Sequence, residues 1–497
     1  MSTFDFDTYL SPFTFRYGSE KMRQIWSEIY KRKLWRKIWV ALATAQQEEG
    51  LITKEELDDL IKHQDSVDIE KAHEVEKEIG HDLMAEIKVF ASQAKIGGGK
   101  IHLGATSMDI EDNADTMRYQ ESLTIIEKEL RDLLNSFADK IETYKNTVCM
   151  GYTHLQPAEP TTLGYRFSFY AQDLLFDLKL LKFVQTNLKG KGLKGAVGTS
   201  ASYTGLLQQN RHSGPLRPPS REAGQSSSEA SLSRIDSGGA DASQNDKSEQ
   251  MEKDVMETLG IEAVTISSQT GPRKLEFFVG MLLSSIAQTL YKFAFDVRLM
   301  QSPGFGEWQE PFGKKQVGSS AMPFKRNPVK SEQICSLARL VFHLSEVSKD
   351  NAAHMLLERT LDDSANRRIY LPETFLAVDT ILISANAILK DLQINQKQIE
   401  RNLALHGPFA ATERVLIEAV KKGANRQEMH EVLRELSMQA WHGMQNGEEN
   451  PLTKLLINDK RIMQFLGAAE IKKLLDPKAH IGLAAFYCEK LLKDLHE

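Results

Sequence analysis

Apolar residues recur every three or four positions through the middle of the chain. The clearest run consists of Leu123, Ile126, Leu130, Leu133, Phe137, Ile141 and Tyr144. Charged residues fill the intervening positions, and this is the pattern of an amphipathic α-helix. Similar spacing returns over residues 165–188, 275–300, 329–348 and 372–392, whereas a period of two is not sustained. The pattern predicts an all-α protein.

The positions of proline allow some of these helices to be long. Proline interrupts helices, and none occurs between Pro12 and Pro157. We therefore expect a bundle of unusually long helices in the middle third of the chain. Several of the apolar stripes are too wide for a single antiparallel neighbour, so assembly of several copies through the bundle follows as a hypothesis.

Composition narrows the class of protein. The chain has 497 residues, more than the roughly 250–300 at which a single core stops growing, so two or three domains are expected. It is 41% hydrophobic and 26% charged, as globular proteins are, and its formal net charge is -6. That charge argues against nucleic acid as the main partner, but it is compatible with local basic pockets for a phosphorylated small molecule.

Cysteine usage and the N-terminus predict the compartment. The cysteines at positions 149, 335 and 488 lie far apart without a CxxC pair, so we expect neither a disulfide framework nor a structural zinc site. The first nine residues are acidic and lack the pattern of a secretory signal, and no run reaches the ~18 apolar residues of a membrane span. We expect a soluble, cytoplasmic protein with no membrane partner.

Two polar segments are interpreted as connections. Residues 210–249 are rich in serine, glycine, proline and charge, which predicts a mobile surface insertion, with a regulatory or partner-binding role as the alternative. Residues 190–195 match GxGxxG, but a dinucleotide-binding fingerprint must follow a strand. Here the glycines follow a helical pattern, so we interpret them as a turn between helices.

A proline-punctuated stretch carries the densest candidate chemistry. Residues 318–328, GSSAMPFKRNP, gather hydroxyls, a lysine and an amide where two prolines and a glycine forbid regular structure. More glycines precede it, so residues 302–323 are a candidate flexible lid. From composition alone, an ordinary solvated linker is an equally good interpretation.

Three further clusters narrow the choice. His154 lies at a predicted helix break, and His81 neighbours Asp82, which can orient its ring. Residues 358–368 concentrate three arginines with a serine, and arginine forks suit phosphate oxygens. The alternatives are a structural role for each histidine and a salt-bridged helix cap for the arginines.

Together these motifs resemble a known family. Residues 318–328 match GSSxMPxKxNP, the signature of the fumarase/aspartase superfamily, at every specified position. With residues 102–107 (HLGATS), residues 153–158 (THLQPA) and the arginine cluster, the chain is similar to the adenylosuccinate lyase family over nearly its whole length. The arginine cluster separates that family from its relatives.

The resemblance implies a fold, an assembly and an activity. The fold is an all-α subunit of three domains, at 1–107, 108–394 (the long-helix bundle) and 395–497, assembled as a homotetramer with active sites shared between subunits. The activity is elimination of fumarate from adenylosuccinate, giving AMP, and from SAICAR, giving AICAR, in purine biosynthesis. No cofactor, metal or nucleic acid is implied.

The resemblance also implies roles for residues, carried over by motif. Ser319 corresponds to the general base, His154 to the general acid, and His81 to a second active-site histidine. Lys325 and Glu332 correspond to residues that support the chemistry. The implied substrate contacts are Arg16, Tyr17, Asp82, Thr106, Ser107, Thr153, Gln269, Asn327, Arg359, Ser364 and Arg368. The sequence departs from the family pattern at Gly80, Gly271 and Gln333.

The residues alone leave alternatives open. Without the resemblance a histidine would be nominated as the base, since it titrates near neutral pH. Another lyase of the superfamily, such as argininosuccinate lyase or a cycloisomerase, would share the loop, but Arg359, Ser364 and Arg368 argue against it. A non-catalytic structural protein on the same scaffold is a third alternative, and the intact candidate catalytic residues argue against that one.

Overall fold

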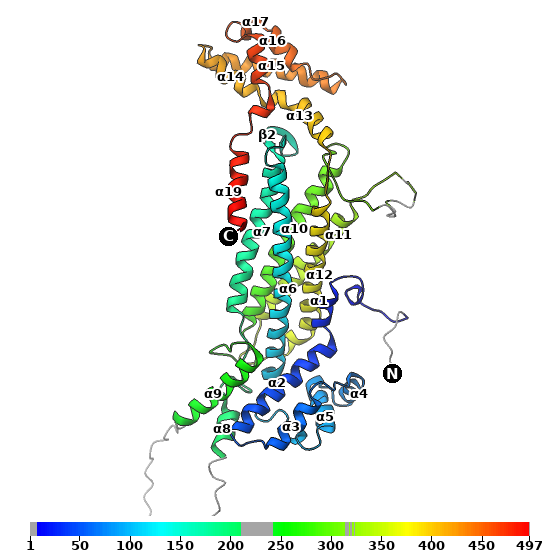
Figure 1. Cartoon of the computed structure of the whole chain (residues 1–497), viewed down its shortest axis with the longest axis vertical. Coiled ribbons are helices and arrows are strands. Elements are labelled where there is room, and N and C mark those ends of the chain that lie inside the picture. The colour runs from blue at the N-terminus through cyan, green and yellow to red at the C-terminus, as the bar shows by residue number, and fades with distance from the viewer. Residues whose placement is uncertain (1–6, 210–241, 314–317, 319–320, 323, 497) are drawn as a thin grey trace, which may run out of the picture. The chain divides into compact units, whose positions relative to one another are not determined.

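The computed structural model describes residues 7–209, 242–313, 318, 321, 322 and 324–496. Its elements run along the chain as shown in Figure 1. The helices of the first half are α1 (Glu20–Ile25), α2 (Glu28–Glu48), α3 (Lys54–His63), α4 (Ile69–Ile79), α5 (Asp82–Gln93), α6 (Ser107–Tyr144), α7 (Leu163–Asn187) and α8 (Ala201–Gln209). Those of the second half are α9 (Ala242–Leu259), α10 (Arg273–Gln301), α11 (Val329–Ala353), α12 (Asp362–Lys390), α13 (Gln396–Ala410), α14 (Thr412–Lys421), α15 (Arg426–Gln445), α16 (Leu452–Asn458), α17 (Lys460–Met463), α18 (Ala468–Leu474) and α19 (Ala484–His496).

Short strands and 3-10 turns complete the chain. The strands are β1 (Val148–Thr153), β2 (Gln156–Thr162), β3 (Trp308–Gln309) and β4 (Gln393–Ile394), and the 3-10 turns are η1 (Pro12–Thr14), η2 (Gly98–Lys100) and η3 (Pro477–Ala479). Strand β1 pairs antiparallel with β2, and β3 with β4. With so little sheet, the prediction of an all-α protein is confirmed, and the five predicted long helices are α6, α7, α10, α11 and α12.

The chain divides into two compact units. Unit 1 contains residues 1–125, 181–283 and 343–377, and unit 2 contains residues 126–180, 284–342 and 378–497. Each of the five long helices contributes residues to both units. The two units are groups of residues that contact one another. The expected division into three domains, with boundaries near residues 107 and 394, stays a prediction.

The core of unit 1 is built around α2. Its apolar stripe includes Trp35, Ile38 and Trp39, which are at most 2% exposed and pack with residues of α5 and α9. Two arginines of α2 are also buried, and both meet the buried carboxylate of Glu86, with Arg32 Nη1 at 3.1 Å and Arg36 Nε at 2.6 Å. Buried charges are tolerated when they are paired in this way.

Unit 2 contains a separate apolar cluster in its C-terminal part. Buried residues between Ala411 and Leu475, from α14 to α18, form this cluster. The β1–β2 hairpin lies earlier in the same unit. Residue Gly151 lies at a register shift within the hairpin, and a Cβ there would come within 2.5 Å of the Glu159 carbonyl oxygen. Only glycine fits this close approach.

Several helix boundaries differ from those expected, and two of them bear on the arginine cluster and the insertion. Helix α12 begins at Asp362, ten residues before the expected start, and it contains Pro372. Arg367 and Arg368 of the arginine cluster therefore lie on the first turns of a helix, and Arg359 precedes it. Helix α9 begins at Ala242, so the last eight residues of the expected insertion are helical, because its lysine and acidic residues suit a helix as well as a loop. Residues 210–241 lie outside the described part of the chain.

In the part of the chain that the structure describes, two helices are long and apolar enough, by length and composition, to cross a membrane. They are α10 and α12, and 56% and 61% of their apolar windows are buried inside the protein. Both also carry buried charged residues, among them Arg273 and Glu276 on α10 and Asp363 on α12. These properties are those of core helices.

Candidate functional site

The expected site residues divide between the two units. Unit 1 contains Arg16, Tyr17, His81, Asp82, Thr106, Ser107, Gln269, Arg359, Ser364 and Arg368. Unit 2 contains Thr153, His154, Lys325, Asn327 and Glu332. Ser319 lies outside the described residues. Each unit is therefore considered by itself.

A small pocket of about 90 Å³ in unit 1 brings three of the expected residues together. Asp82, at the start of α5, lines it with Ser364 and Arg368 of α12. The other lining residues were not predicted from the sequence, and they are Trp26, Glu28, Lys31, Trp35, Glu111, Asp115, Arg118, Arg367, Leu371 and Pro372. Four of the thirteen lining residues are basic, namely Lys31, Arg118, Arg367 and Arg368. Four others are acidic, namely Glu28, Asp82, Glu111 and Asp115, so the lining has no excess of basic residues. Arg368 is the most exposed of the four cations, at 59%, and is therefore the one best placed to meet an anionic group.

The start of α5 is shaped by its first residues. His81 is the N-cap of α5, and its Nδ1 accepts a hydrogen bond from the Met84 amide at 3.4 Å. Arg368 donates to Asp82 at 2.9 Å. Burial would raise the pKa of Asp82, but Arg368 and Lys31 outweigh it and hold that pKa below its usual range. Asp82 is thus an anion that aligns Arg368 at the pocket.

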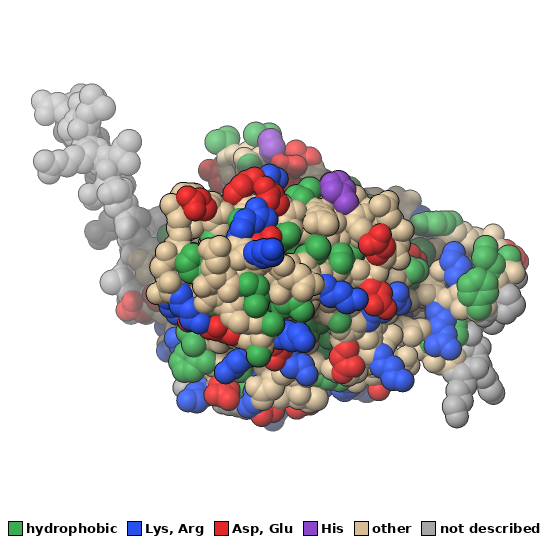
Figure 2. Space-filling model, turned by 90° about the horizontal axis from the view of Figure 1, so that it is seen from above, with side chains coloured by type: hydrophobic (Ala, Val, Ile, Leu, Met, Phe, Trp, Pro, Cys, Tyr) green, Lys and Arg blue, Asp and Glu red, His purple; other side chains and the backbone are tan. Residues whose placement is uncertain are grey.

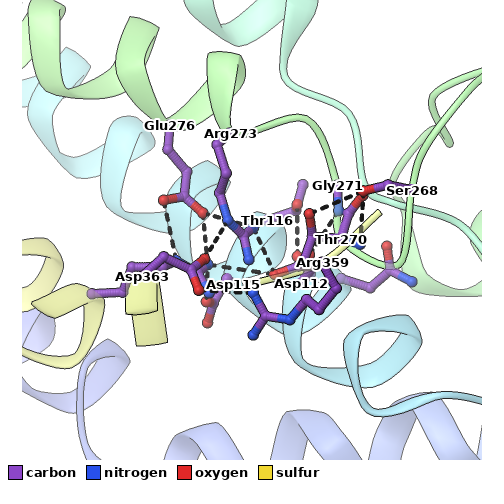
Figure 3. Close-up of polar contacts among 12 residues, drawn as sticks. Asp112, Asp115, Thr116, Ser268, Thr270, Gly271, Arg273, Glu276, Arg359 and Asp363 are labelled. Carbon is purple, nitrogen blue, oxygen red and sulfur yellow. Dashed lines mark hydrogen bonds and ion pairs between the residues drawn. The ribbon is translucent and has the colours of Figure 1, made fainter. Parts of the chain in front are cut away.

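Buried ion pairs join the first turns of α12 to α6 and α10, and Figure 3 shows those of Arg273. Arg273 of α10 donates through Nε to Asp363 at 2.8 Å and through Nη1 to Asp112 at 2.9 Å and Glu276 at 3.1 Å. Arg367 meets Glu276 at 2.6 Å and Asp115 at 2.8 Å. All these side chains are buried or nearly so, so the network holds α6, α10 and α12 in a fixed arrangement.

Both interpretations of the arginine cluster are therefore represented in it. Arg359 is ion-paired with Asp363 at 2.8 Å, as a helix-end salt bridge would be. Arg368 lies at the pocket and is 59% exposed. Arg367 was not predicted as a functional residue, although helical spacing could have shown that it faces the buried network. Residues 363 and 367 are four apart and share a face, while 364 and 368 share the neighbouring one.

The other expected contacts in unit 1 lie on turns. Arg16 lies over the ring of Phe15, and Tyr17 packs on Phe13, so this pair is held by its own segment. The Thr106 amide donates to Asp109 at 3.0 Å at the start of α6. The Gln269 amide donates to the carbonyl of Glu358 at 3.1 Å, which joins Gln269 to the residue before Arg359.

The glycine turn after α7 is organised by one carboxylate. Buried Asp109 accepts hydrogen bonds from the amides of Lys194 and Gly195, at 3.1 and 3.2 Å, and from the hydroxyl of Tyr203 at 3.1 Å. It also pairs with the ammonium group of Lys191. The GxGxxG segment is thus a turn between α7 and α8, as expected, and its amides bind a protein carboxylate.

In unit 2, His154 lies at the tip of the β1–β2 hairpin. Thr153 pairs with Gln156, so His154 and Leu155 form a two-residue turn, with φ of 54° and 59°. Positive φ at both positions is the requirement of a type I′ turn, which usually selects Asn-Gly. His154 is exposed at this tip, and its conformation is unfavourable for a side chain with a Cβ.

The described part of the signature loop is held at its base. Asn327 donates from Nδ2 to the Gly318 carbonyl at 3.0 Å. A Cβ on Gly318 would come within 2.0 Å of the Lys325 carbonyl oxygen, so only glycine fits there. Lys325 is exposed, and Glu332 is an exposed residue in the first turn of α11. The Asn327 amide nitrogen thus closes the loop onto itself.

The surface shows no strongly basic face in the view of Figure 2, where side chains of both signs are interspersed. Among the described residues, Glu159, Glu413 and His480 place potential metal-ligand atoms within 4.8 Å of one another. Both glutamates are exposed, and exposed acidic groups commonly lie close together without an ion. This group includes none of the expected site residues.

Comparison with known proteins places this geometry in a family. The family model described as Lyase matches residues 13–211 and 224–342, and the model for the adenylosuccinate lyase C-terminus matches residues 408–491. The chain is 36% identical to the adenylosuccinate lyases of Schistosoma mansoni and Saccharomyces cerevisiae, covering 98% of this chain and 95% of each of those proteins. It is 35% identical to that of Methanocaldococcus jannaschii, over 97% of this chain and 96% of that protein.

Solved structures share the fold, and the Lyase family model shows the class of protein. A 3-carboxy-cis,cis-muconate lactonizing enzyme from Pseudomonas putida aligns with a TM-score of 0.80 at 21% identity, covering 97% of this chain and 98% of that one. A fumarate lyase from Mesorhizobium sp. BNC1 aligns with a TM-score of 0.79 at 20% identity, covering 98% and 99%. The fold is that of the fumarase/aspartase superfamily. The full-length sequence matches go further, and the chain belongs to the adenylosuccinate lyase family.

Proposed function

We propose that this protein eliminates fumarate from adenylosuccinate, giving AMP, and from SAICAR, giving AICAR. The observation that carries the proposal is the match to adenylosuccinate lyases over 98% of the chain, C-terminal region included. Ser364 and Arg368, which line one pocket, support it, since a hydroxyl and an exposed guanidinium can contact the phosphate of a nucleotide. The reaction belongs to purine biosynthesis, and we infer that it takes place in the cytoplasm without a cofactor or metal.

The first requirement of the reaction is a base. In our proposal Ser319 removes the proton next to a succinyl carboxylate, and the electron pair forms the new C=C bond as the C–N bond breaks. If a serine hydroxyl ionises some six units above neutral pH, forming the alkoxide costs about 8 kcal/mol. The charge of Lys325, six residues along the same loop, offsets part of that cost in a closed site.

The second requirement is stabilisation of negative charge. As the proton leaves, charge accumulates on the succinyl carboxylate, and Lys325 and backbone amides of the loop are suitable donors. Asn327 was expected to serve in the same way. Its Nδ2 donates to the Gly318 carbonyl, so we assign Asn327 first to the shape of the loop.

The third requirement is an acid for the leaving nitrogen. We assign His154, since a histidine titrates near neutral pH and can give a proton to an adenine or carboxamide nitrogen. It lies at a hairpin tip with its side chain exposed. His81, beside Asp82, is assigned to the catalytic groups as the second active-site histidine. Thr153 precedes His154 and is assigned with Thr106, Ser107 and Gln269 to substrate contacts.

We also propose a homotetramer with active sites shared between subunits. In unit 2 several long helices each expose a large apolar side chain, namely Phe176 at 58%, Phe295 at 47% and Ile383 at 44%. Such residues on several helices of one unit favour coverage by other copies. Light scattering coupled to size exclusion tests this, and a monomer mass at working concentration would exclude it.

The activity is tested by following the ultraviolet absorbance of fumarate with three substrates. We expect release from adenylosuccinate and from SAICAR, and none from argininosuccinate. Release from argininosuccinate alone would instead assign the protein to another reaction of the superfamily. Absence of release from all three, with a folded tetramer, would favour a non-catalytic scaffold.

A further inference from the structure

The hairpin that carries His154 is attached to the segment between α10 and the signature loop. Tyr152 of β1 packs edge-on against Phe305, with ring centroids 4.9 Å apart and planes at 84°. Its hydroxyl lies 3.4 Å from Glu307 Oε1. Arg166 of α7 donates both to the carbonyl of Met150 in β1 and, at 3.1 Å, to Glu307 Oε2. All of these residues belong to unit 2.

Glu307 is the centre of these contacts. It is 0% exposed, and its Oε1 also accepts from Asn402 Nδ2 of α13 at 3.0 Å. Its backbone is held as well, because its amide donates to the Met300 carbonyl at 3.1 Å and its carbonyl accepts from the Asn395 amide at 2.8 Å. A buried carboxylate with its partners satisfied on several elements has one position relative to all of them.

The same segment leads into the base of the signature loop three residues later. The side chain of Gln301 joins the two ends of the loop. Its Oε1 accepts a hydrogen bond from the backbone amide of Glu310 at 2.8 Å, and its Nε2 donates to the backbone carbonyl of Arg326 at 2.9 Å. The Glu310 carboxylate accepts from the Lys330 amide at 2.8 Å, at the start of α11. Glu307, which contacts the hairpin, is therefore three residues from Glu310, which contacts the base of the signature loop.

Buried ion pairs of this kind are weak contributors to stability, since an apolar replacement of equal volume is often neutral or better. A role in geometry explains this one more directly. We propose that Glu307 is a positioning residue for the lyase reaction: through Arg166 and Tyr152 its carboxylate fixes the hairpin turn that presents His154. This inference rests on the proposed function, and it concerns how the proposed acid, His154, is oriented.

The main test is Glu307→Gln, which keeps the size of the side chain and removes the charge that Arg166 meets. Because a displacement of about 1 Å can cost 10²-fold in rate, we expect kcat for fumarate release to fall roughly 10- to 100-fold. KM is expected to change less than about threefold, since the phosphate-binding residues belong to the unit 1 pocket. An unchanged kcat in the folded variant would overturn the proposal.

A double-mutant cycle separates positioning from general damage. In a His154→Asn background the acid is already absent, so Glu307→Gln should cost at most about twofold. A full, additive loss in that background would show that Glu307 does not act through His154 and would overturn the proposal. A wild-type protein without lyase activity would instead contradict the proposed function itself.

Asp177→Asn is the matched control. Asp177 is 2% exposed, in unit 2 on the same helix as Arg166, and it accepts from Thr289 at 2.9 Å. It lies eleven residues from Arg166, about 16 Å along the helix. We expect Asp177→Asn to lower the melting temperature and leave kcat within twofold. A loss of kcat equal to that of Glu307→Gln would overturn the assignment of Glu307 as a positioning residue.

Tyr152→Phe serves if Glu307→Gln does not fold. It removes only the hydroxyl that faces Glu307 and keeps the packing on Phe305. We expect a two- to fivefold loss of kcat that vanishes in the His154→Asn background. A loss that persists in that background would count against the proposal in the same way.

Discussion

The two units hold their candidate site residues in different ways. In unit 1, Ser364 and Arg368 lie on the first turns of α12, which Arg273 and Arg367 fix to α6 and α10 through buried ion pairs. In unit 2, His154 lies at the tip of a hairpin and Lys325 in a loop that is closed by single hydrogen bonds. In this comparison the proposed phosphate contacts Ser364 and Arg368 lie on a helix, and the proposed reacting groups His154 and Lys325 lie on turns.

This difference follows from what each part has to do. A phosphate group keeps its charge throughout the reaction, so its partners need one constant geometry. Proton donors and acceptors must approach the reacting atoms and then release fumarate, and turns and loops rearrange at lower cost than helices. The comparison therefore predicts that substitutions of Ser319 and His154 in unit 2 act on turnover. Substitutions of Arg273 and Arg368 in unit 1 should act on stability and affinity.

The largest effect is expected at the base. For Ser319→Ala we expect kcat to fall by roughly 10³-fold or more while substrate affinity stays within about threefold, because the hydroxyl acts on the transition state and the pocket supplies binding. Single-turnover kinetics with a separate binding measurement test this. A rate near that of the wild type would return the role of base to a histidine.

The next effect is on stability in unit 1. Arg273→Met leaves the carboxylates of Asp112, Glu276 and Asp363 without their shared cation, and we expect about 3–5 kcal/mol less free energy of unfolding in urea. The control is Arg434→Met, which removes an exposed pair with Glu431 and should change little. Equal effects of the two variants would contradict the proposed role of the buried network.

A smaller effect is expected on affinity. Arg368→Met should raise KM for adenylosuccinate about tenfold or more and leave kcat within threefold, since charged hydrogen bonds contribute about 1.5–3 kcal/mol. Arg461→Met is the matched control, because Arg461 is also an exposed, ion-paired arginine. A loss confined to kcat for Arg368→Met would place this arginine with the reacting groups.

The smallest effect depends on pH. Burial, followed by Asp82, Asp112 and Asp115, raises the pKa of Glu111 to about 8. Between its ordinary pKa and 8 the folded state keeps a proton that the unfolded state has lost, so the stability contributed by this group falls as pH rises through that window.

Glu111→Gln removes that dependence. We expect the variant to melt above the wild type at pH 8.5, where the wild type carries a buried charge, and at the same temperature near pH 4.5. Differential scanning fluorimetry across this range measures the difference, with exposed Glu74→Gln as control. A difference independent of pH would mean that Glu111 ionises normally.

The long helices could be predicted from sequence because their apolar positions repeat over many turns, as from Leu123 to Tyr144 in α6. The β1–β2 hairpin could not. Strand β2 contains Pro157 and Pro160, which argue against a strand, and its turn is His-Leu where Asn-Gly would be the usual signal. Pairing with β1 overrides both local signals.

The candidate residues were found by resemblance to motifs, and their partners were not. Arg367 and Asp115 meet at 2.8 Å although 252 positions separate them in the chain. No local sequence pattern predicts such a pair, because the contact depends on how α6, α10 and α12 pack. The same holds for Glu307 and Arg166, so sequence identified groups that react and the structure identified groups that hold them.

The turn at His154 and Leu155 has a consequence for attempts to make this protein more heat-resistant. Each residue with a Cβ held at positive φ costs about 1–2 kcal/mol, so glycine at position 155 should be among the simplest stabilising changes available. The same change would widen the range of directions in which the imidazole can point. A screen that measures melting temperature alone would therefore favour glycine at position 155 and give a more stable but less active protein.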